Sequence, residues 1–131
     1  MTHPLYDFAD RYTTAWCSDN PSKVAEFFAP NGTLTINGGV PHTGREAIAA
    51  SAASFMEAFP DLVVTLRGVD DVDGRVAYHW TLAGTNTGPG GTGRAVRIDG
   101  TELWQIDEAG LIADSIGSFD VEAYQRQLQG R

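Results

Sequence analysis

The sequence predicts a single α+β domain in which three helices precede a mainly antiparallel β-sheet. Apolar residues recur at helical spacing as far as Phe59, whereas from Leu62 onward they alternate at the period of two that is typical of strands. Because helices and strands occupy separate parts of the chain, an alternating βαβ arrangement is excluded. The length of 131 residues and the hydrophobic fraction of 42% suit one domain, which we place at residues 1–131.

Three segments of the first half have the apolar spacing of amphipathic helices. The first covers about residues 5–16 and has a strongly aromatic face. The second starts at Pro21, is short, and is expected to include Phe27 and Phe28 before a Pro-Asn-Gly sequence ends it. The third runs from about Arg45 to Phe59, because the residue after Phe59 is a proline.

Alternating and β-branched segments define the expected strands. A brief strand precedes the third helix, and longer strands joined by turns follow it. Asp-Gly at residues 73–74 and Asp-Glu-Ala-Gly at residues 107–110 are typical of such turns. The expected strands cover residues 33–36, 62–66, 75–85, 95–106 and 111–119, and a short terminal helix covers residues 121–128.

The acidic composition excludes two classes of partner. Seventeen Asp and Glu residues against nine Lys and Arg residues give a formal net charge of −8. Such a charge repels phosphate backbones and anionic lipid headgroups. No apolar run approaches the length that a membrane span needs. We therefore expect neither a nucleic-acid nor a membrane partner.

Cysteine and histidine usage argues against a metal site. Cys17 has no second cysteine with which to form a disulfide or a zinc-binding pair, which favours a reducing compartment. The first residues lack the basic start and apolar stretch of a signal peptide, so a cytoplasmic location is expected. His3 is terminal, His42 falls in a predicted loop and His79 is expected to point outward, so we expect no bound metal.

Six segments, taken in their order and spacing, resemble a known family. They are RYTTAW at residues 11–16, FFAPNG at 27–32, GREAI at 44–48, FPDL at 59–62, and the longer segments 75–88 and 102–112. Together they resemble SnoaL-like proteins of the nuclear transport factor 2-like superfamily over essentially the whole chain. The resemblance implies a cone-shaped cup of helices on a curved sheet. It leaves the chemistry open, because the superfamily includes polyketide cyclases, ketosteroid isomerases, epoxide hydrolases, dehydratases and non-enzymatic binding modules.

Glu102 is the most informative residue for function. In the implied cup, every second residue of the long strands faces the pocket. A carboxylate at such a position costs several kcal/mol unless it is paired or protonated, so we expect a raised pKa. The alternatives are that an arginine or a backbone amide pairs with it, or that it faces water. The expected inward residues are Tyr78, Trp80, Leu82, Val96, Ile98, Gly100, Glu102, Trp104 and Ile106.

The resemblance also implies roles for individual positions. Glu102 falls where ketosteroid isomerases carry an oxyanion-stabilising aspartate and SnoaL-type cyclases carry an active-site histidine. Tyr12 matches the isomerase tyrosine that donates a hydrogen bond to the oxyanion, although packing on the aromatic helix face explains it equally well. The isomerase base falls at Ile36, or at Asn37 if the following loop has a gap. Neither side chain can abstract a proton.

The aspartate of SnoaL-type cyclases and limonene epoxide hydrolases has no counterpart either. Its position aligns with Gly117 on the last expected strand. If the protein is an enzyme, Glu102 must therefore be its principal acid or base. Tyr12 and Asn37 are expected to join Glu102 in catalysis, and Ser115 is expected to contact the substrate as a further hydrogen-bonding group.

These observations predict a cofactor-free enzyme of the cyclase or isomerase kind, acting by proton transfer on a largely apolar, carbonyl-bearing, polyketide- or steroid-like substrate. The alternative is a non-catalytic ligand-binding or accessory domain with the same pocket, which the missing aspartates favour. Both need a small apolar or aromatic ligand. Because family members commonly dimerise through the outer face of the sheet, we also expect a homodimer. The expected pocket walls are Trp16, Phe55, Phe59, Tyr78, Trp80, Leu82 and Trp104.

Overall fold

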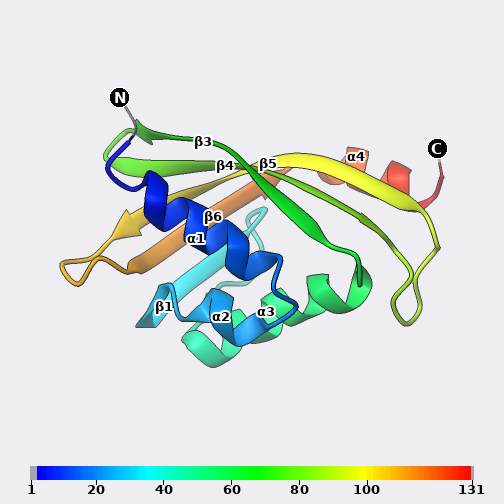
Figure 1. Ribbon diagram of the computed structural model, residues 1–131, viewed down its shortest axis with the longest axis horizontal. Helices are drawn as coiled ribbons and strands as arrows, with labels where there is room; N and C mark the ends of the chain where they lie inside the picture. Colours follow the sequence, from blue (N-terminus) through cyan, green and yellow to red (C-terminus); the bar gives the residue numbers. More distant parts are fainter. Residues whose placement is uncertain (1–2, 131) are drawn as a thin grey trace.

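The computed structural model describes residues 3–130 and shows helices packed on a curved sheet (Figure 1). The helices are α1 (Tyr6–Trp16), α2 (Pro21–Ala25), α3 (Arg45–Ala58) and α4 (Val121–Leu128). The strands are β1 (Phe28–Ile36), β2 (His42–Thr43), β3 (Val63–Val72), β4 (Arg75–Thr85), β5 (Ala95–Ile106) and β6 (Ile112–Phe119). The predicted α+β class is confirmed.

The six strands form one sheet in the order β2-β1-β6-β5-β4-β3. β1 pairs with β6 in parallel, and the other neighbours are antiparallel. The longest pairing joins β4 to β5, from Val76 opposite Trp104 to Thr85 opposite Ala95. α1 packs against β3, α3 against β1 and α4 against β5. The long central strands therefore have one face turned toward helices, and the core lies between the two layers.

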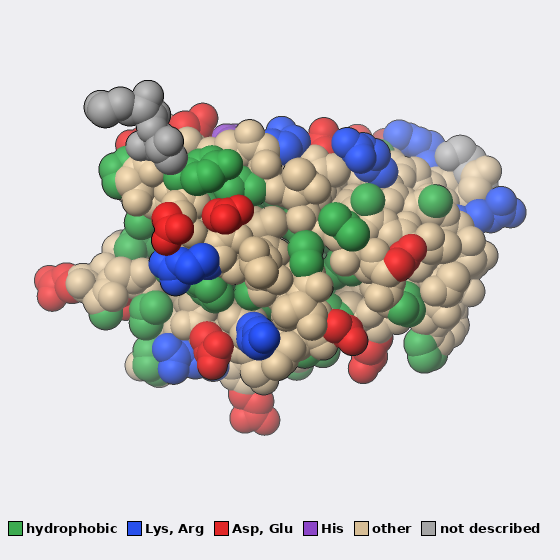
Figure 2. Space-filling view, viewed as in Figure 1, with side chains coloured by type: hydrophobic (Ala, Val, Ile, Leu, Met, Phe, Trp, Pro, Cys, Tyr) green, Lys and Arg blue, Asp and Glu red, His purple; other side chains and the backbone are tan. Residues whose placement is uncertain are grey.

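α1 separates an apolar face from a charged one. Phe8, Tyr12 and Trp16 are buried against the sheet and the other helices. On the opposite side, Arg11 Nε lies 3.0 Å from Asp7 Oδ2, one helical turn away. Figure 2 shows acidic and basic side chains interspersed over this face of the molecule. Because both members of the pair are exposed, the sheet-facing aromatic residues, rather than this ion pair, hold α1 in place.

The prediction that the second helix includes Phe27 and Phe28 is wrong. α2 ends at Ala25, and β1 begins at Phe28. The Phe27 carbonyl accepts a hydrogen bond from the backbone N–H of Ile112 at 2.9 Å, and Phe28 pairs with Ile112 in the parallel ladder. Pairing with a strand more than eighty residues away has therefore overridden a local helical spacing, as is common where tertiary contacts compete with weak propensity.

The later elements agree closely with the sequence. β4, β5 and α4 have the predicted bounds, while β3 extends to Val72 beyond the predicted segment. A register shift between Leu66 and Gly68 interrupts the pairing of β3 with β4. In β5, the even-numbered residues from Val96 to Trp104 are buried and their odd-numbered neighbours are more exposed. The predicted inward parity of this strand is confirmed.

One close approach on the inner face of the sheet depends on a glycine. Trp80 on β4 pairs with Gly100 on β5. A Cβ atom added to Gly100 would overlap the six-membered ring of Trp80, with Cε2 only 2.6 Å away. The indole therefore lies directly over Gly100, in the space that any other residue would fill. This contact sets the position of the Trp80 ring.

We predict that Gly100→Ala destabilises the protein by about 1–3 kcal/mol, because the added methyl group must displace the Trp80 ring. Urea unfolding followed by circular dichroism measures the change. Gly117→Ala is the matched control, since an added Cβ there has its nearest neighbour, Glu102 Cγ, at 3.6 Å. The control should change stability by less than about 1 kcal/mol. Equal stability of Gly100→Ala and wild type would contradict the placement of Trp80 over Gly100.

Candidate functional site

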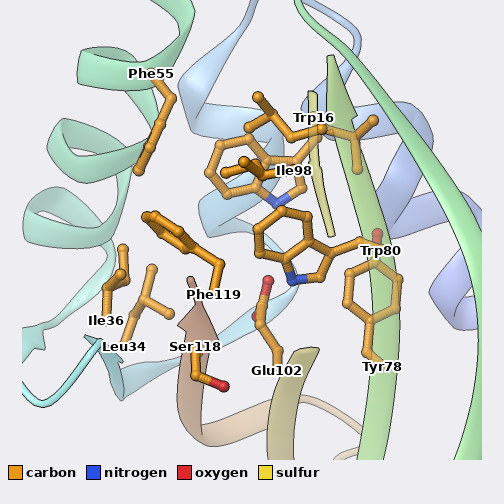
Figure 3. A pocket seen from close by; sticks show the side chains of 13 residues that line it. Trp16, Leu34, Ile36, Phe55, Tyr78, Trp80, Ile98, Glu102, Ser118 and Phe119 are labelled. Carbon is orange, nitrogen blue, oxygen red and sulfur yellow. The ribbon is translucent and has the colours of Figure 1, made fainter. Parts of the chain in front are cut away.

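A pocket with an empty volume of about 550 Å³, its open mouth included, lies between the sheet and helices α1 and α3 (Figure 3). Nearly all of its lining is aliphatic or aromatic, as is typical of sites that bind small apolar molecules. Glu102 is the one carboxyl group among the lining residues. The pocket is lined by Trp16, Leu34, Ile36, Phe55, Val64, Tyr78, Trp80, Leu82, Ile98, Glu102, Gly117, Ser118 and Phe119.

Glu102 is held by three neutral side-chain donors. Its Oε1 atom accepts hydrogen bonds from Ser115 Oγ at 2.8 Å, from Trp104 Nε1 at 3.0 Å and from the Tyr12 hydroxyl at 3.0 Å. The Tyr12 hydroxyl also lies 3.2 Å from Oε2. Within residues 3–130, no Lys, Arg or His forms an ion pair with Glu102. Uncharged groups therefore satisfy this buried carboxyl, in place of the arginine or backbone amide considered from the sequence.

Burial raises the pKa of Glu102 above its ordinary value, and the hydrogen bonds from Trp104, Ser115 and Tyr12 offset part of that effect. The side chain is only 7% exposed, so the charged form loses most of its hydration. Oε1 has three protein donors and Oε2 only the longer contact from Tyr12, so Oε2 has the greater remaining capacity for a proton or a ligand hydrogen bond. The expected direction of the pKa shift is confirmed.

Two of the three donors to Glu102, Tyr12 and Trp104, belong to an aromatic cluster beneath the pocket. The Tyr12 ring meets Trp104 and Tyr78 edge to face, with centroid distances of 5.2 and 5.3 Å. Tyr78 stacks on Trp104 at 4.9 Å, and its hydroxyl lies 2.6 Å from Thr13 Oγ1. Burial and the nearby Glu102 charge raise the pKa of Tyr12 well above its ordinary value. Tyr12 therefore stays protonated and acts as a hydrogen-bond donor.

Most of the predicted site residues come together, but they form two groups. Trp16, Phe55, Tyr78, Trp80 and Leu82 line the pocket as predicted. Tyr12, Trp104 and Ser115 lie behind Glu102, are fully buried and point their polar atoms at its carboxyl group. Trp104, predicted as a pocket wall, and Ser115, predicted to contact the substrate, are therefore not among the lining residues and contact Glu102 instead.

Two further predicted residues, Phe59 and Asn37, line neither the pocket nor the surroundings of Glu102. Phe59 is fully buried near the end of α3 and packs against Tyr124 of α4 at a centroid distance of 6.4 Å. Asn37 is exposed in the turn after β1, where φ is 51°. Its side-chain oxygen accepts a hydrogen bond from the backbone N–H of Phe119 at 2.9 Å. Asn37 therefore ties the end of β6 to the turn, and the structure does not bring it to Glu102.

Several lining residues were missed at the level of the sequence. Phe119 faces the pocket from β6, on the same side as Ser115 and Gly117, and its alternation with those two residues could have identified it. Leu34 and Ile36 follow the same period of two on β1. Their parity was readable from the sequence, but the parallel pairing that brings β1 beside β6 was not.

Gly117 lies directly beside Glu102. The two residues pair across β5 and β6, and an added Cβ at Gly117 would be in ordinary contact with Glu102 Cγ at 3.6 Å. A Cβ atom therefore fits at position 117 without displacing Glu102. With glycine there, Glu102 has no second carboxyl group from the lining residues to share a proton with.

Among residues 3–130, no three His, Cys, Asp or Glu side chains are arranged so as to hold a metal ion. None of the helices in the same range is long and apolar enough to cross a membrane.

Solved structures with the same architecture come from several bacteria. A protein with a ketosteroid isomerase-like fold from Catenulispora acidiphila, in complex with trimethylamine, is similar with a TM-score of 0.82 at 18% identity, over 98% of this chain and 95% of that one. A protein assigned as a SnoaL-like polyketide cyclase from Jannaschia sp. gives a TM-score of 0.76 at 17% identity, over 100% of this chain and 98% of that one. A phenazine biosynthesis-related protein from Pseudomonas aeruginosa gives a TM-score of 0.75 at 16% identity, over 95% of this chain and 87% of that one.

At these identities, the structural likeness establishes the fold and leaves the reaction open. Among curated proteins, no sequence matches the chain at a significant level. A family model for the SnoaL-like domain matches residues 9–115, which include most of α1 together with Glu102 and Ser115. The match over residues 9–115 shows that the chain belongs to the SnoaL-like domain family.

Proposed function

We propose that the pocket binds a small, largely apolar, carbonyl-bearing molecule and that Glu102 transfers a proton to or from it. One observation carries this proposal: a single carboxyl group with a raised pKa lines an otherwise apolar and aromatic pocket. A carboxyl group in such surroundings can give and take a proton closer to neutral pH than an exposed one. The reaction class that fits is a cofactor-free isomerisation or cyclisation.

The reacting atom of Glu102 is Oε2. As an acid, its O–H donates to a ligand carbonyl oxygen and stabilises the charge that develops there. As a base, Oε2 takes a proton from the carbon beside the carbonyl, the C–H electron pair forms an enolate, and the proton returns to a different carbon. No other atom is gained or lost, so the sequence is an isomerisation.

Tyr12, Trp104 and Ser115 are positioning residues in this proposal. Their three hydrogen bonds converge on Oε1 and fix the carboxyl plane. Because all three donors are neutral, they support the carboxyl group without the strong lowering of its pKa that an adjacent cation produces. They therefore aim Oε2 at the ligand while leaving its proton available.

A non-catalytic binding domain is the second candidate function. The observation that favours it is Gly117, which leaves Glu102 without a second carboxyl group beside it in the pocket. The Catenulispora protein of the same fold holds trimethylamine, a small ligand. In this case Glu102 anchors a polar group of the ligand and no bond changes.

We also propose that the protein is a homodimer through the outer face of its sheet. Ile116 on β6 pairs with Leu103 on β5, which pairs in turn with Ala77 on β4. Leu103 and Ile116 point away from the helices, and Ile116 is 41% exposed, whereas Ala77 between its neighbours is fully buried. An exposed apolar side chain beside a second apolar residue on an open sheet face suits a protein–protein contact.

For the dimer, we expect light scattering to give twice the monomer mass of 14.1 kDa at micromolar concentration. Ile116→Lys should shift the mass toward the monomer, because a charge would then lie in the apolar centre of the contact. Val40→Lys is the control, since Val40 is 82% exposed in the loop after β1. A wild-type mass equal to that of one chain would refute the dimer.

We predict that Glu102→Gln separates the two functions. If Glu102 is catalytic, turnover of a suitable substrate should fall in the variant by a factor on the order of 100 or more, because the amide cannot exchange the proton. Incubation of a panel of bicyclic ketones followed by mass and NMR analysis measures new products. Glu108→Gln, an exposed change in the β5–β6 turn, is the control. Unchanged turnover in Glu102→Gln would rule out the proton-transfer role.

A further prediction concerns stability and pH. Because the folded pKa of Glu102 lies above its ordinary value of 4.5, its proton stabilises the folded state fully below that value, and this contribution is lost as pH rises through the folded pKa. The melting temperature of the wild type should therefore fall relative to that of Glu102→Gln as pH rises from 4.5. Parallel thermal melts across pH 4–9 measure the difference. The opposite trend would show that Glu102 is stabilised as a charged group.

A further inference from the structure

Trp80 carries a buried hydrogen-bond donor without a partner. Among side chains in residues 3–130, its Nε1 atom is the only buried nitrogen or oxygen that makes no hydrogen bond. The indole N–H of Trp104, by contrast, donates to Glu102 at 3.0 Å. Because buried donors are nearly always paired in folded proteins, an unpaired one in a pocket wall indicates a place where a ligand acceptor binds.

The Trp80 ring is held in place over the inner face of the sheet. Gly100 lies directly beneath it, and Phe119 packs against it edge to face with a centroid distance of 6.1 Å. Figure 3 shows the ring nitrogen on the side of the indole that faces the Glu102 carboxyl group. Both side chains line the same pocket. The N–H therefore points toward the Glu102 carboxyl group, the one acidic side chain among the lining residues.

The two groups define the chemistry of one ligand atom. The Trp80 N–H can only donate, so its partner must be an acceptor. Glu102 Oε2 can donate when it is protonated and accept when it is not. A carbonyl oxygen suits two donors, and a hydroxyl oxygen suits a donor and an acceptor. An ammonium group has no lone pair for Trp80 and would leave its N–H unpaired.

We infer that the pocket selects ligands with a neutral oxygen acceptor on an apolar ring system, and that the indole N–H of Trp80 donates a hydrogen bond to that oxygen beside Glu102. This inference rests on the proposed function only in taking the pocket as a ligand site, and it requires no turnover. It makes Trp80 a specificity-determining donor in addition to an aromatic wall.

The test uses three bicyclic probes that differ at one position: 1-tetralone, which has a ketone, tetralin, which has no oxygen, and 1-aminotetralin, which is a cation at neutral pH. Wild type should bind 1-tetralone at least about tenfold more tightly than tetralin, since an acceptor pairs the otherwise unpaired donor. Calorimetry or an NMR titration gives the dissociation constants. Tightest binding of the amine, or no binding of 1-tetralone, overturns the inference.

Two tryptophan variants supply the matched comparison. Trp80→Phe keeps an aromatic wall and removes the N–H, so the preference for 1-tetralone over tetralin should fall by a factor on the order of ten. Trp16→Phe makes the same chemical change in another wall of the pocket and should keep the preference within about twofold. An equal loss of preference in both variants would contradict a specific role for Trp80.

A spectroscopic measurement on the wild-type protein does not depend on how the variants fold. The chain contains three tryptophans, so ¹⁵N labelling gives three indole N–H signals. The Trp80 signal should move downfield with 1-tetralone and not with tetralin. If 1-tetralone binds and that signal stays in place, the inference fails. If the signal moves and no ketone is turned over, proton transfer by Glu102 fails and the role of Trp80 stands.

Discussion

The buried carboxyl group of Glu102 is the constraint on which the rest of the site depends. Left unpaired in an aromatic interior, it would destabilise the fold, so its neighbours must supply hydrogen bonds. The chain supplies them from three separate elements: Tyr12 from α1, Trp104 from β5 and Ser115 from β6. These bonds join the helical layer to the sheet at the base of the pocket. The hydrogen bond from Tyr12 therefore both satisfies the carboxyl group and helps to hold α1 on the sheet.

The shape of the pocket follows from residue size on the inner face of two strands. Gly100 leaves the space that the Trp80 indole occupies, and Gly117 leaves open space beside Glu102. The two glycines thus act differently: one admits a neighbouring ring, and the other keeps the surroundings of Glu102 free. Because the sheet backbone is already paired on both sides of each glycine, side-chain volume alone decides what the pocket can hold.

The chemistry of this cup therefore depends on few positions. The SnoaL-like fold supplies an apolar cavity lined by alternate strand residues, and a change of one inward side chain alters the reactive group without altering the sheet. In this chain one carboxyl group lines the cavity, held by neutral donors, with an indole N–H beside it. That combination suits a ligand whose polar part is a single oxygen.

The sequence alone determined the fold class, the bounds of β4, β5 and α4, and the inward parity that placed Glu102, Trp80 and Trp104 on one face. These are local properties, because periodicity and turn chemistry act over a few residues. The tertiary structure decided where Phe28 and Asn37 belong, since the parallel pairing of β1 with β6 joins segments far apart in the chain. It also decided how Glu102 is satisfied: its Tyr12 donor lies 90 residues away, and only packing could bring the two together. The alternation of residues along a strand shows on which face of the sheet a side chain lies. Which atoms contact it there depends on how elements distant in the sequence pack together.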